Sequence, residues 1–126
     1  MEGVNYLKLN SISAYKISFN LSNYVWKIVI HWNYFEKDTV GKQFARAIDS
    51  VSANIAEGFG RYGKKDKIKF YRYSYGSIKE SLDWNEKSRA CNLLSNKEYN
   101  LIFCELNKLP KEINSLIKFT NSRLTI

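Results

Sequence analysis

The stretch Val51-Ser52-Ala53-Asn54-Ile55-Ala56-Glu57-Gly58-Phe59-Gly60-Arg61 decides the architecture of this 126-residue chain. Its apolar residues recur at the three- and four-residue spacing of one helix face, and the pattern stops at two glycines. Glycine adopts the left-handed backbone of a helix C-cap without steric cost, so we expect Gly58 or Gly60 to end the helix. A dense basic segment follows at once. This order predicts a buried helix end beside a positively charged surface.

The same apolar spacing continues on both sides and predicts four helices in one domain spanning residues 1–126. We expect them at about 11–32, 40–59, 64–92 and 96–122. Ser95 and Glu98 match a capping box at the start of the last helix, and Pro110 should kink that helix because it lacks a backbone donor. Residues 33–41 are expected to form a loop. Short connections favour antiparallel neighbours, which predicts an all-α, up-down-up-down antiparallel four-helix bundle.

The first expected helix carries two apolar stripes. One stripe consists of Ala14, Ile17, Leu21, Tyr24, Ile28 and Trp32, and the other of Ile12, Tyr15, Phe19, Trp26 and Ile30. A helix that packs on one side needs only one stripe. The second stripe therefore favours burial against a neighbouring subunit, and a helix central to a monomeric core is the alternative.

The net charge of +8, from 20 Lys and Arg against 12 Asp and Glu, indicates an anionic partner, with nucleic acid the usual one. A basic surface that serves solubility alone is the alternative. Six of the cations lie between Arg61 and Arg72 with a single anion, and aromatic residues are interleaved with them. Cations neutralise phosphates, and aromatic faces stack on unpaired bases. If six phosphates are neutralised, log K should fall with log salt at a slope of about −5.

The candidate phosphate contacts are Arg61, Lys64, Lys65, Lys67, Lys69 and Arg72, with Arg46 as a further candidate. The alternative is a solvated helix start whose aromatic residues lie in the core. A rival interpretation is an interaction scaffold whose basic surface docks an acidic protein or a partner enzyme. A nuclease is a third hypothesis, and it lacks the clustered carboxylates that a metal would need.

Three other residues stand out in the middle of the chain. Asn54 and Glu57 lie one turn apart, and we expect them to be a hydrogen-bonded structural pair tying the second helix to the first or third. Glu57 is also spaced to pair with Arg61. Gly76 interrupts the third helix at a cost of about 1 kcal/mol in helix stability relative to Ala, so we expect it to let another helix approach closely, and a weakly kinked, exposed position is the alternative.

Several common chemistries find no support in the residues. The Gly58-to-Gly63 run matches G-x-G-x-x-G, but a helix precedes it where a dinucleotide site needs a strand. Cys91 and Cys104 are expected to be buried free thiols, and the single His31 cannot complete a zinc site. We therefore expect no cofactor, no metal and no catalytic residue. No apolar run approaches membrane-spanning length and Met1 to Asn10 has no apolar core, so we expect a cytoplasmic protein.

The chain resembles the small four-helix-bundle proteins encoded in intervening sequences of bacterial 23S ribosomal RNA genes. The resemblance rests on residues 50–61 and on the run from Phe70-Tyr71-Arg72 through residues 76–80, with Arg46 also fitting the pattern. That family is similar to the accessory variability proteins of diversity-generating retroelements. The chain departs from the pattern at Ser52, where the family commonly has Pro, and in its richness in Tyr and Lys over residues 61–75.

The resemblance implies a homopentamer, in which the bundles form a ring or barrel around a central channel, with no enzymatic activity of its own. In the retroelement relatives the basic barrel binds nucleic acid and a reverse transcriptase. We therefore expect nucleic acid, with RNA favoured, further copies of the chain and a partner protein as binding partners.

Overall fold

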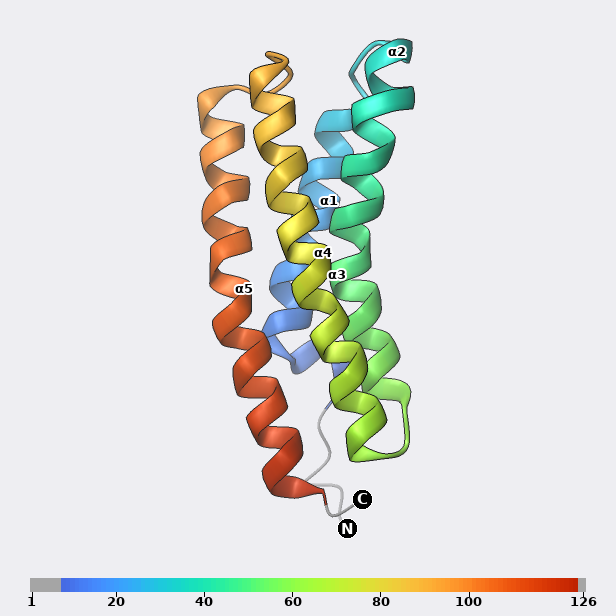
Figure 1. Cartoon of the computed structure of the whole chain (residues 1–126). Coiled ribbons are helices and arrows are strands. Elements are labelled where there is room, and N and C mark those ends of the chain that lie inside the picture. Colours follow the sequence, from blue (N-terminus) through green and yellow to red (C-terminus); the bar gives the residue numbers. More distant parts are fainter. Residues whose placement is uncertain (1–7, 125–126) are drawn as a thin grey trace.

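Four long helices form a bundle in the computed structural model, which describes residues 8–124 (Figure 1). They are α1 (Ser13–Val29), α3 (Lys42–Gly60), α4 (Lys64–Ala90) and α5 (Asn96–Arg123). A 3-10 turn, Leu9–Ser11, precedes α1, and the short α2 (Tyr34–Glu36) leads into α3. Over residues 8–124 the chain contains no strand. The expected all-α helical bundle is thus confirmed, with helix ends within about three residues of the predicted ones.

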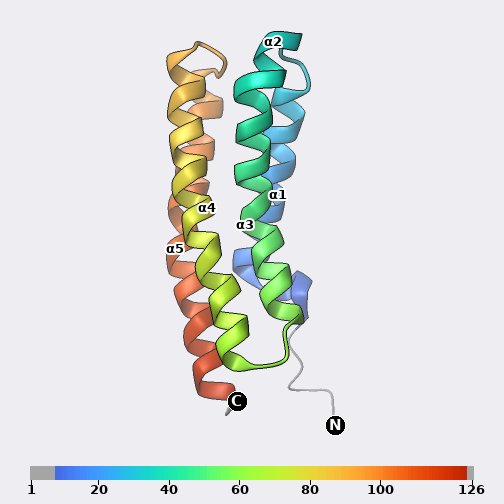
Figure 2. The same cartoon turned by 45° about the vertical axis from the view of Figure 1, so that its right-hand side comes forward.

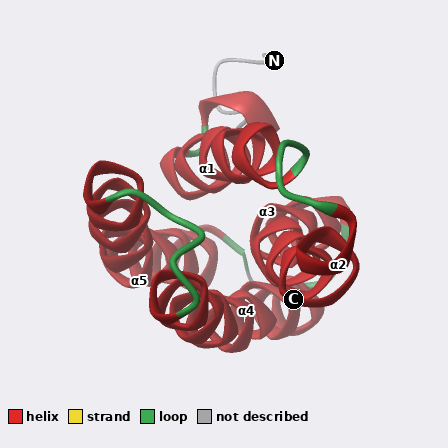
Figure 3. Cartoon of the chain, turned by 90° about the horizontal axis from the view of Figure 1, so that it is seen from above, coloured by secondary structure: helices red, strands yellow, loops and turns green. Residues whose placement is uncertain are grey.

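Each long helix packs against two others. The neighbouring pairs are α1 with α3, α3 with α4, α4 with α5, and α5 with α1, and a view down the bundle shows the four helices around a common centre (Figure 3). The connections from α1 to α3 and from α4 to α5 lie at the top of the bundle in Figure 1, which we call the upper end. The α3–α4 turn lies at the opposite end, which we call the turn end, and the turned view in Figure 2 shows the same arrangement. Segments far apart in the sequence therefore meet at each end.

The core follows the predicted apolar spacing most closely in α3 and α5. In α3 the side chains of Phe44, Ile48, Val51 and Ile55 are almost fully buried. Their steps of four, three and four residues keep them on one face, which is why the sequence pattern located them. The α1 stripe holds less well, because Val25, Val29 and two serines share the core with Ala14 and Leu21.

The expected loop over residues 33–41 is helical, which corrects the prediction. Asn33 accepts a hydrogen bond from the backbone N–H of Glu36 at 2.9 Å, and the Glu36 carboxylate accepts one from the Asn33 N–H. This capping box starts α2, and a π-helical segment, Lys37–Gly41, carries the chain directly into α3. The polar residues that suggested a loop are the capping residues of a helix start.

The expected role of Gly58 and Gly60 as a left-handed stop is wrong. No glycine of residues 8–124 has a positive φ, and Arg61 after the helix is extended. Gly58 lies inside α3, where a Cβ would come within 2.7 Å of the Tyr71 ring and 2.8 Å of the Lys67 carbonyl oxygen. Glycine is needed there because α4 approaches closely, and Gly60 merely ends the helix in open space.

Gly76 does not admit a neighbouring helix. It is exposed, and a Cβ placed on it would meet nothing within 4 Å. The close approach expected at Gly76 occurs instead at Gly58. Pro110 lies inside α5, which continues through it. The axis of α5 bends along its length in Figure 1.

Serine hydroxyls, and not Asn54 or Glu57, tie α3 to its neighbours. Asn54 donates to the Ser50 carbonyl of its own helix at 2.9 Å, and Glu57 is exposed and pairs with Arg61. Two ties between α3 and its neighbours come from Ser22, which donates to Asp49 at 2.7 Å, and Ser74, which donates to the Val51 carbonyl at 3.0 Å. The i,i+4 pairing of Glu57 with Arg61 is confirmed, while among residues 8–124 neither Asn54 nor Glu57 bonds to another helix.

Both cysteines are exposed, which corrects the expectation of buried thiols. Cys104 follows Ile102 by two positions, about 200° around the helix, so it faces away from the core that Ile102 enters. Cys91 lies just beyond the last residue of α4.

Candidate nucleic-acid interface

The α3–α4 turn brings six of the seven candidate cations, Lys67 among them, to one end of the bundle. α3 ends at Gly60, and α4 starts at Lys64 after three residues. Gly63 is the N-cap of α4 and offers no side-chain hydrogen bond to the first turn. Cations therefore surround a helix start whose backbone N–H groups also favour anions.

Lys67 has a structural role that the sequence did not reveal. Its Nζ donates to the carbonyl oxygen of Phe59 at 2.6 Å and reaches that of Gly58 at 3.5 Å. These carbonyls lie at the end of α3, where the N–H groups of a following turn are missing, and the Gly58 carbonyl also accepts from the Arg61 N–H at 3.2 Å. Burial lowers the pKa of Lys67, and its ammonium lies 5.5 Å from the centre of the Phe59 ring. Lys67 thus closes the turn and is the candidate least able to reach a phosphate.

Arg61 and Lys69 share one acidic neighbour. Arg61 pairs with Glu57 at 2.8 Å and with Asp66 at 3.6 Å, and Lys69 pairs with Asp66 at 3.2 Å. All four side chains are about half exposed, so each pair contributes about 0–1 kcal/mol and is easily exchanged for another anion. The guanidinium of Arg61 also lies 4.5 Å from the centre of the Phe70 ring.

Lys64, Lys65 and Arg72 have no carboxylate within ion-pair distance in the described part of the chain. They line an open groove of about 920 Å³ together with Lys69 and its partner Asp66. Ile68 and Tyr73 of α4 and Asn121 of α5 complete the lining. The groove thus has a strongly basic rim with an aromatic and an aliphatic side chain between the charges.

Arg46 is separated from this cluster. It is exposed on α3, fifteen residues before Arg61, which corresponds to about 22 Å along a helix axis. The structure therefore unites six of the seven candidates and leaves Arg46 apart.

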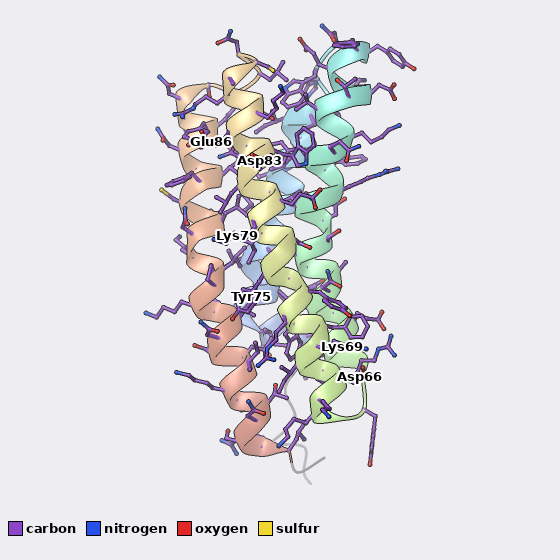
Figure 4. All side chains as sticks on the ribbon, in the orientation of Figure 1. Asp66, Lys69, Tyr75, Lys79, Asp83 and Glu86 are labelled. Carbon is purple, nitrogen blue, oxygen red and sulfur yellow. The ribbon has the colours of Figure 1, made fainter. Side chains whose placement is uncertain are left out.

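The charge along α4 changes from one end to the other. Asp66 and Lys69 lie beside the turn in Figure 4, whereas Asp83 and Glu86 lie towards the other end, with Lys79 between. Residues 61–72 hold six cations and one anion, while residues 79–89 hold three of each. The excess positive charge is thus confined to the end of α4 that follows the turn.

The aromatic residues of this region fall into two groups. Tyr71 is buried against Gly58, and burial raises its pKa to about 12. Tyr62 in the turn is 84% exposed and Tyr73 is 52% exposed. Phe70 packs edge-on against Tyr73 at 5.3 Å between ring centres. The sequence pattern could separate Tyr71 by its place on the apolar stripe, but gave no sign of the Phe70–Tyr73 contact.

Two further findings limit the chemistry of residues 8–124. No three His, Cys, Asp or Glu side chains there lie close enough together to hold a metal ion. None of the helices in this range has the length and apolar character needed to span a membrane. His31 is exposed beyond the end of α1.

Comparisons with known proteins identify a matching family and a protein of similar structure. The family model described as 23S rRNA-intervening sequence protein matches residues 10–115. A crystal structure at 1.70 Å of a protein of unknown function, from the S23 ribosomal protein family of Bacteroides thetaiotaomicron VPI-5482, superposes with a TM-score of 0.73. The two sequences are 19% identical, and the match covers 83% of this chain and 98% of the other. At that identity the likeness shows the fold alone. A search of curated proteins found no match.

Proposed function

The chain belongs to the family of 23S rRNA-intervening sequence proteins, and from that premise we propose that it binds nucleic acid, with RNA favoured, through the turn end of the bundle. The observation that carries the proposal is the set of Lys64, Lys65 and Arg72, which line one groove without a carboxylate partner among residues 8–124. Unpaired cations repel one another, and phosphates relieve that repulsion while releasing counterions. Arg61 and Lys69 add two charges whose exposed pairs exchange readily.

The groove suits a polyanion better than a small acid. Lys65, Lys69 and Arg72 recur at steps of four and three along one helix face. Lys65 and Arg72 are seven positions apart in α4, about 10 Å along the axis, so the three cations can contact successive phosphates of one strand. A single carboxylate would satisfy only one of them.

The test compares two variants of equal charge. Replacing Lys64, Lys65 and Arg72 with Glu should weaken binding of a ribosomal RNA fragment by at least about 100-fold, because three phosphate contacts become repulsions. Glutamates in the first turn of a helix are favourable, so α4 should still form. The control replaces Lys27, Lys37 and Lys97, exposed lysines at the upper end, with Glu.

The control variant should bind within about three-fold of the wild type if the turn is the site, since both variants change the net charge equally. Equal losses in the two variants would show that overall charge and not the turn holds the RNA. Full binding by the turn variant would refute the site. A binding partner that remains after nuclease treatment would favour the rival scaffold, which docks an acidic protein or a partner enzyme such as a reverse transcriptase.

We further propose that the up-down-up-down bundle self-associates through the outer face of α1, in a ring of five if the resemblance to pentameric relatives holds. Three large apolar side chains of its second stripe, Phe19, Trp26 and Ile30, are exposed, with Trp26 at 57%. Light scattering should give a mass about five-fold that of the 14.8 kDa chain. Replacing Trp26 with Glu should lower that mass, and a monomeric wild type would contradict the proposal.

We also propose that the protein has no enzymatic activity of its own. The function that we infer is binding, with no cofactor and no catalytic residue. RNA incubated with the protein and Mg²⁺ should therefore be recovered intact on a denaturing gel. Cleavage that persists in highly purified protein would contradict this.

A further inference from the structure

Tyr73 gives the basic groove a feature that phosphate binding alone does not need. Tyr73 lines the groove and its side chain is half exposed, although it lies only two residues after the buried Tyr71. Its ring packs edge-on against Phe70, with an interplanar angle of 82°. The Arg61 guanidinium lies 4.5 Å and the Lys69 ammonium 5.3 Å from the centre of the Phe70 ring. The phenol thus packs against a neighbouring ring and still presents surface to the groove.

Gly76 leaves bare backbone one turn beyond Tyr73. It follows Tyr73 by three residues and Arg72 by four, so it lies one turn further along the same exposed face. A Cβ at Gly76 would meet no atom within 4 Å, and its φ is not positive. Neither packing nor backbone conformation explains a glycine in the interior of a 27-residue helix. An uncovered strip of backbone one turn beyond an aromatic residue gives room for a flat group to lie against the helix.

We propose that this groove binds single-stranded nucleic acid, with one unpaired base stacked on Tyr73 against the bare backbone at Gly76, and phosphates on Lys65, Lys69 and Arg72. This inference rests on the proposed function and specifies its substrate. In a duplex the bases are stacked on each other and offer no free face to Tyr73, so a duplex would use the cations alone. A positive groove with aromatic platforms is the arrangement by which proteins hold single strands without sequence preference.

The experiment measures fluorescence anisotropy with four labelled probes at equal salt. The probes are an unstructured 16-nucleotide RNA, the same strand as a duplex, an abasic strand of the same length, and a 16-residue poly-glutamate peptide. Replacing Tyr73 with Leu should weaken binding of the single strand by about 5- to 150-fold, the range that loss of one stacked base gives. Binding of the duplex and of the abasic strand should change by less than about two-fold, because neither offers a free base.

Two variants guard against a trivial loss of shape. Tyr73→Phe keeps the ring and should bind the single strand like the wild type. Gly76→Gln fills the strip and should weaken the single strand but not the duplex, while its helix should be more stable than that of the wild type. Tyr62→Leu tests the other exposed tyrosine of the turn and should have a smaller effect, since Tyr62 does not line the groove.

The outcomes separate this inference from the proposed function. If Tyr73→Leu leaves the single strand unaffected, or weakens all RNA probes equally, base stacking is refuted. The phosphate site still stands in that case if the Lys64, Lys65 and Arg72 reversal abolishes binding. If that reversal changes nothing, the proposed function fails first. Poly-glutamate bound as tightly as RNA would identify an acidic protein as the occupant and overturn the inference.

Discussion

The two ends of the bundle are completed in different ways. At the upper end, α2 and α5 each start with a local capping box, Asn33 with Glu36 and Ser95 with Glu98. At the turn end, α4 starts at an uncapped Gly63, and α3 is closed by Lys67 from the following helix. At the upper end, side chains three residues apart in sequence make the hydrogen bonds to the backbone groups of the helix starts. At the turn end, a lysine from the following helix makes the bond to the carbonyl that ends α3.

The difference indicates where the chain can accept a ligand. Local caps satisfy the backbone groups of the upper end without outside help. The turn end keeps uncapped N–H groups and cations without carboxylate partners among residues 8–124. An end that is stable by itself needs no partner, whereas the turn end gains favourable interactions when an anion arrives. The following predictions test that contrast, from the largest expected effect to the smallest.

Gly58→Ala should destabilise the protein most. The added Cβ would lie 2.7 Å from the Tyr71 ring and 2.8 Å from the Lys67 carbonyl oxygen, and the backbone atom cannot move aside cheaply. We expect a loss of about 2–3 kcal/mol in the free energy of unfolding by urea, as for an overpacked core. Gly60→Ala is the control, because a Cβ there meets nothing, and a loss of equal size at Gly60 would contradict the close-approach account.

Alkaline pH should loosen the turn end through Tyr71. Burial raises the pKa of Tyr71 from 10.0 to about 12, so the folded state favours the neutral phenol. The stabilisation is complete below pH 10 and is lost as pH rises towards 12, at up to about 1.4 kcal/mol per pH unit. Tyr71→Phe has no such proton to lose, so the difference in stability between wild type and variant should change only in this window. A constant difference from pH 8 to 12 would refute the assignment.

Removing a helix cap at the upper end should lower stability, and adding one at the turn end should raise it. Ser95→Ala removes the hydrogen bond to the Glu98 N–H and should lower stability by about 1 kcal/mol. Gly63→Ser adds a cap where none exists and should raise stability by a few tenths of a kcal/mol, since a Cβ there meets no neighbour. Thermal unfolding followed by circular dichroism measures both. Stability lost in both variants would mean that the turn end is already satisfied.

Asp66→Asn should give the smallest effect and the opposite sign in binding. It removes the one anion between Arg61 and Arg72, which frees Lys69 and leaves Arg61 paired with Glu57 alone. RNA affinity should rise by about two- to five-fold, the range of exposed ion pairs. With Lys67 engaged in the turn, the salt slope for a single strand should be about −3.5, for five contacts, and not the slope of about −4 that six single-strand contacts would give. Weaker binding after the substitution would mean that Asp66 orients its neighbours.

Regular spacing made most of the fold predictable. The core residues of α3 lie at the steps expected of one helix face, and the Ser95–Glu98 capping box makes both of its hydrogen bonds. Such features depend on residues a few positions apart, so they can be read directly from the chain. The helical segment at residues 34–41 was missed although Asn33 and Glu36 have the same spacing, because the polar residues there also fit a loop.

Contacts across the turn could not be predicted. The bond from Lys67 to the Phe59 carbonyl and the approach of Tyr71 to Gly58 depend on the path of residues 61–63 and on the angle between α3 and α4. For the same reason, six candidate cations could be identified from the sequence, but the structural role of Lys67 at the end of α3 could not. It also placed the close approach at Gly76 in place of Gly58, since a glycine in a helical pattern looks alike whether it is packed or exposed.

The two solvent-facing thiols make the molecule easy to tag away from its basic groove. Cys91 lies 27 residues after Lys64, about 40 Å along α4, so a maleimide dye attached there reports on RNA without touching the turn. The same accessibility has a practical drawback. Protein kept without reductant will form covalent dimers through these sulfurs, and a mass measured on such a sample would not reflect native assembly.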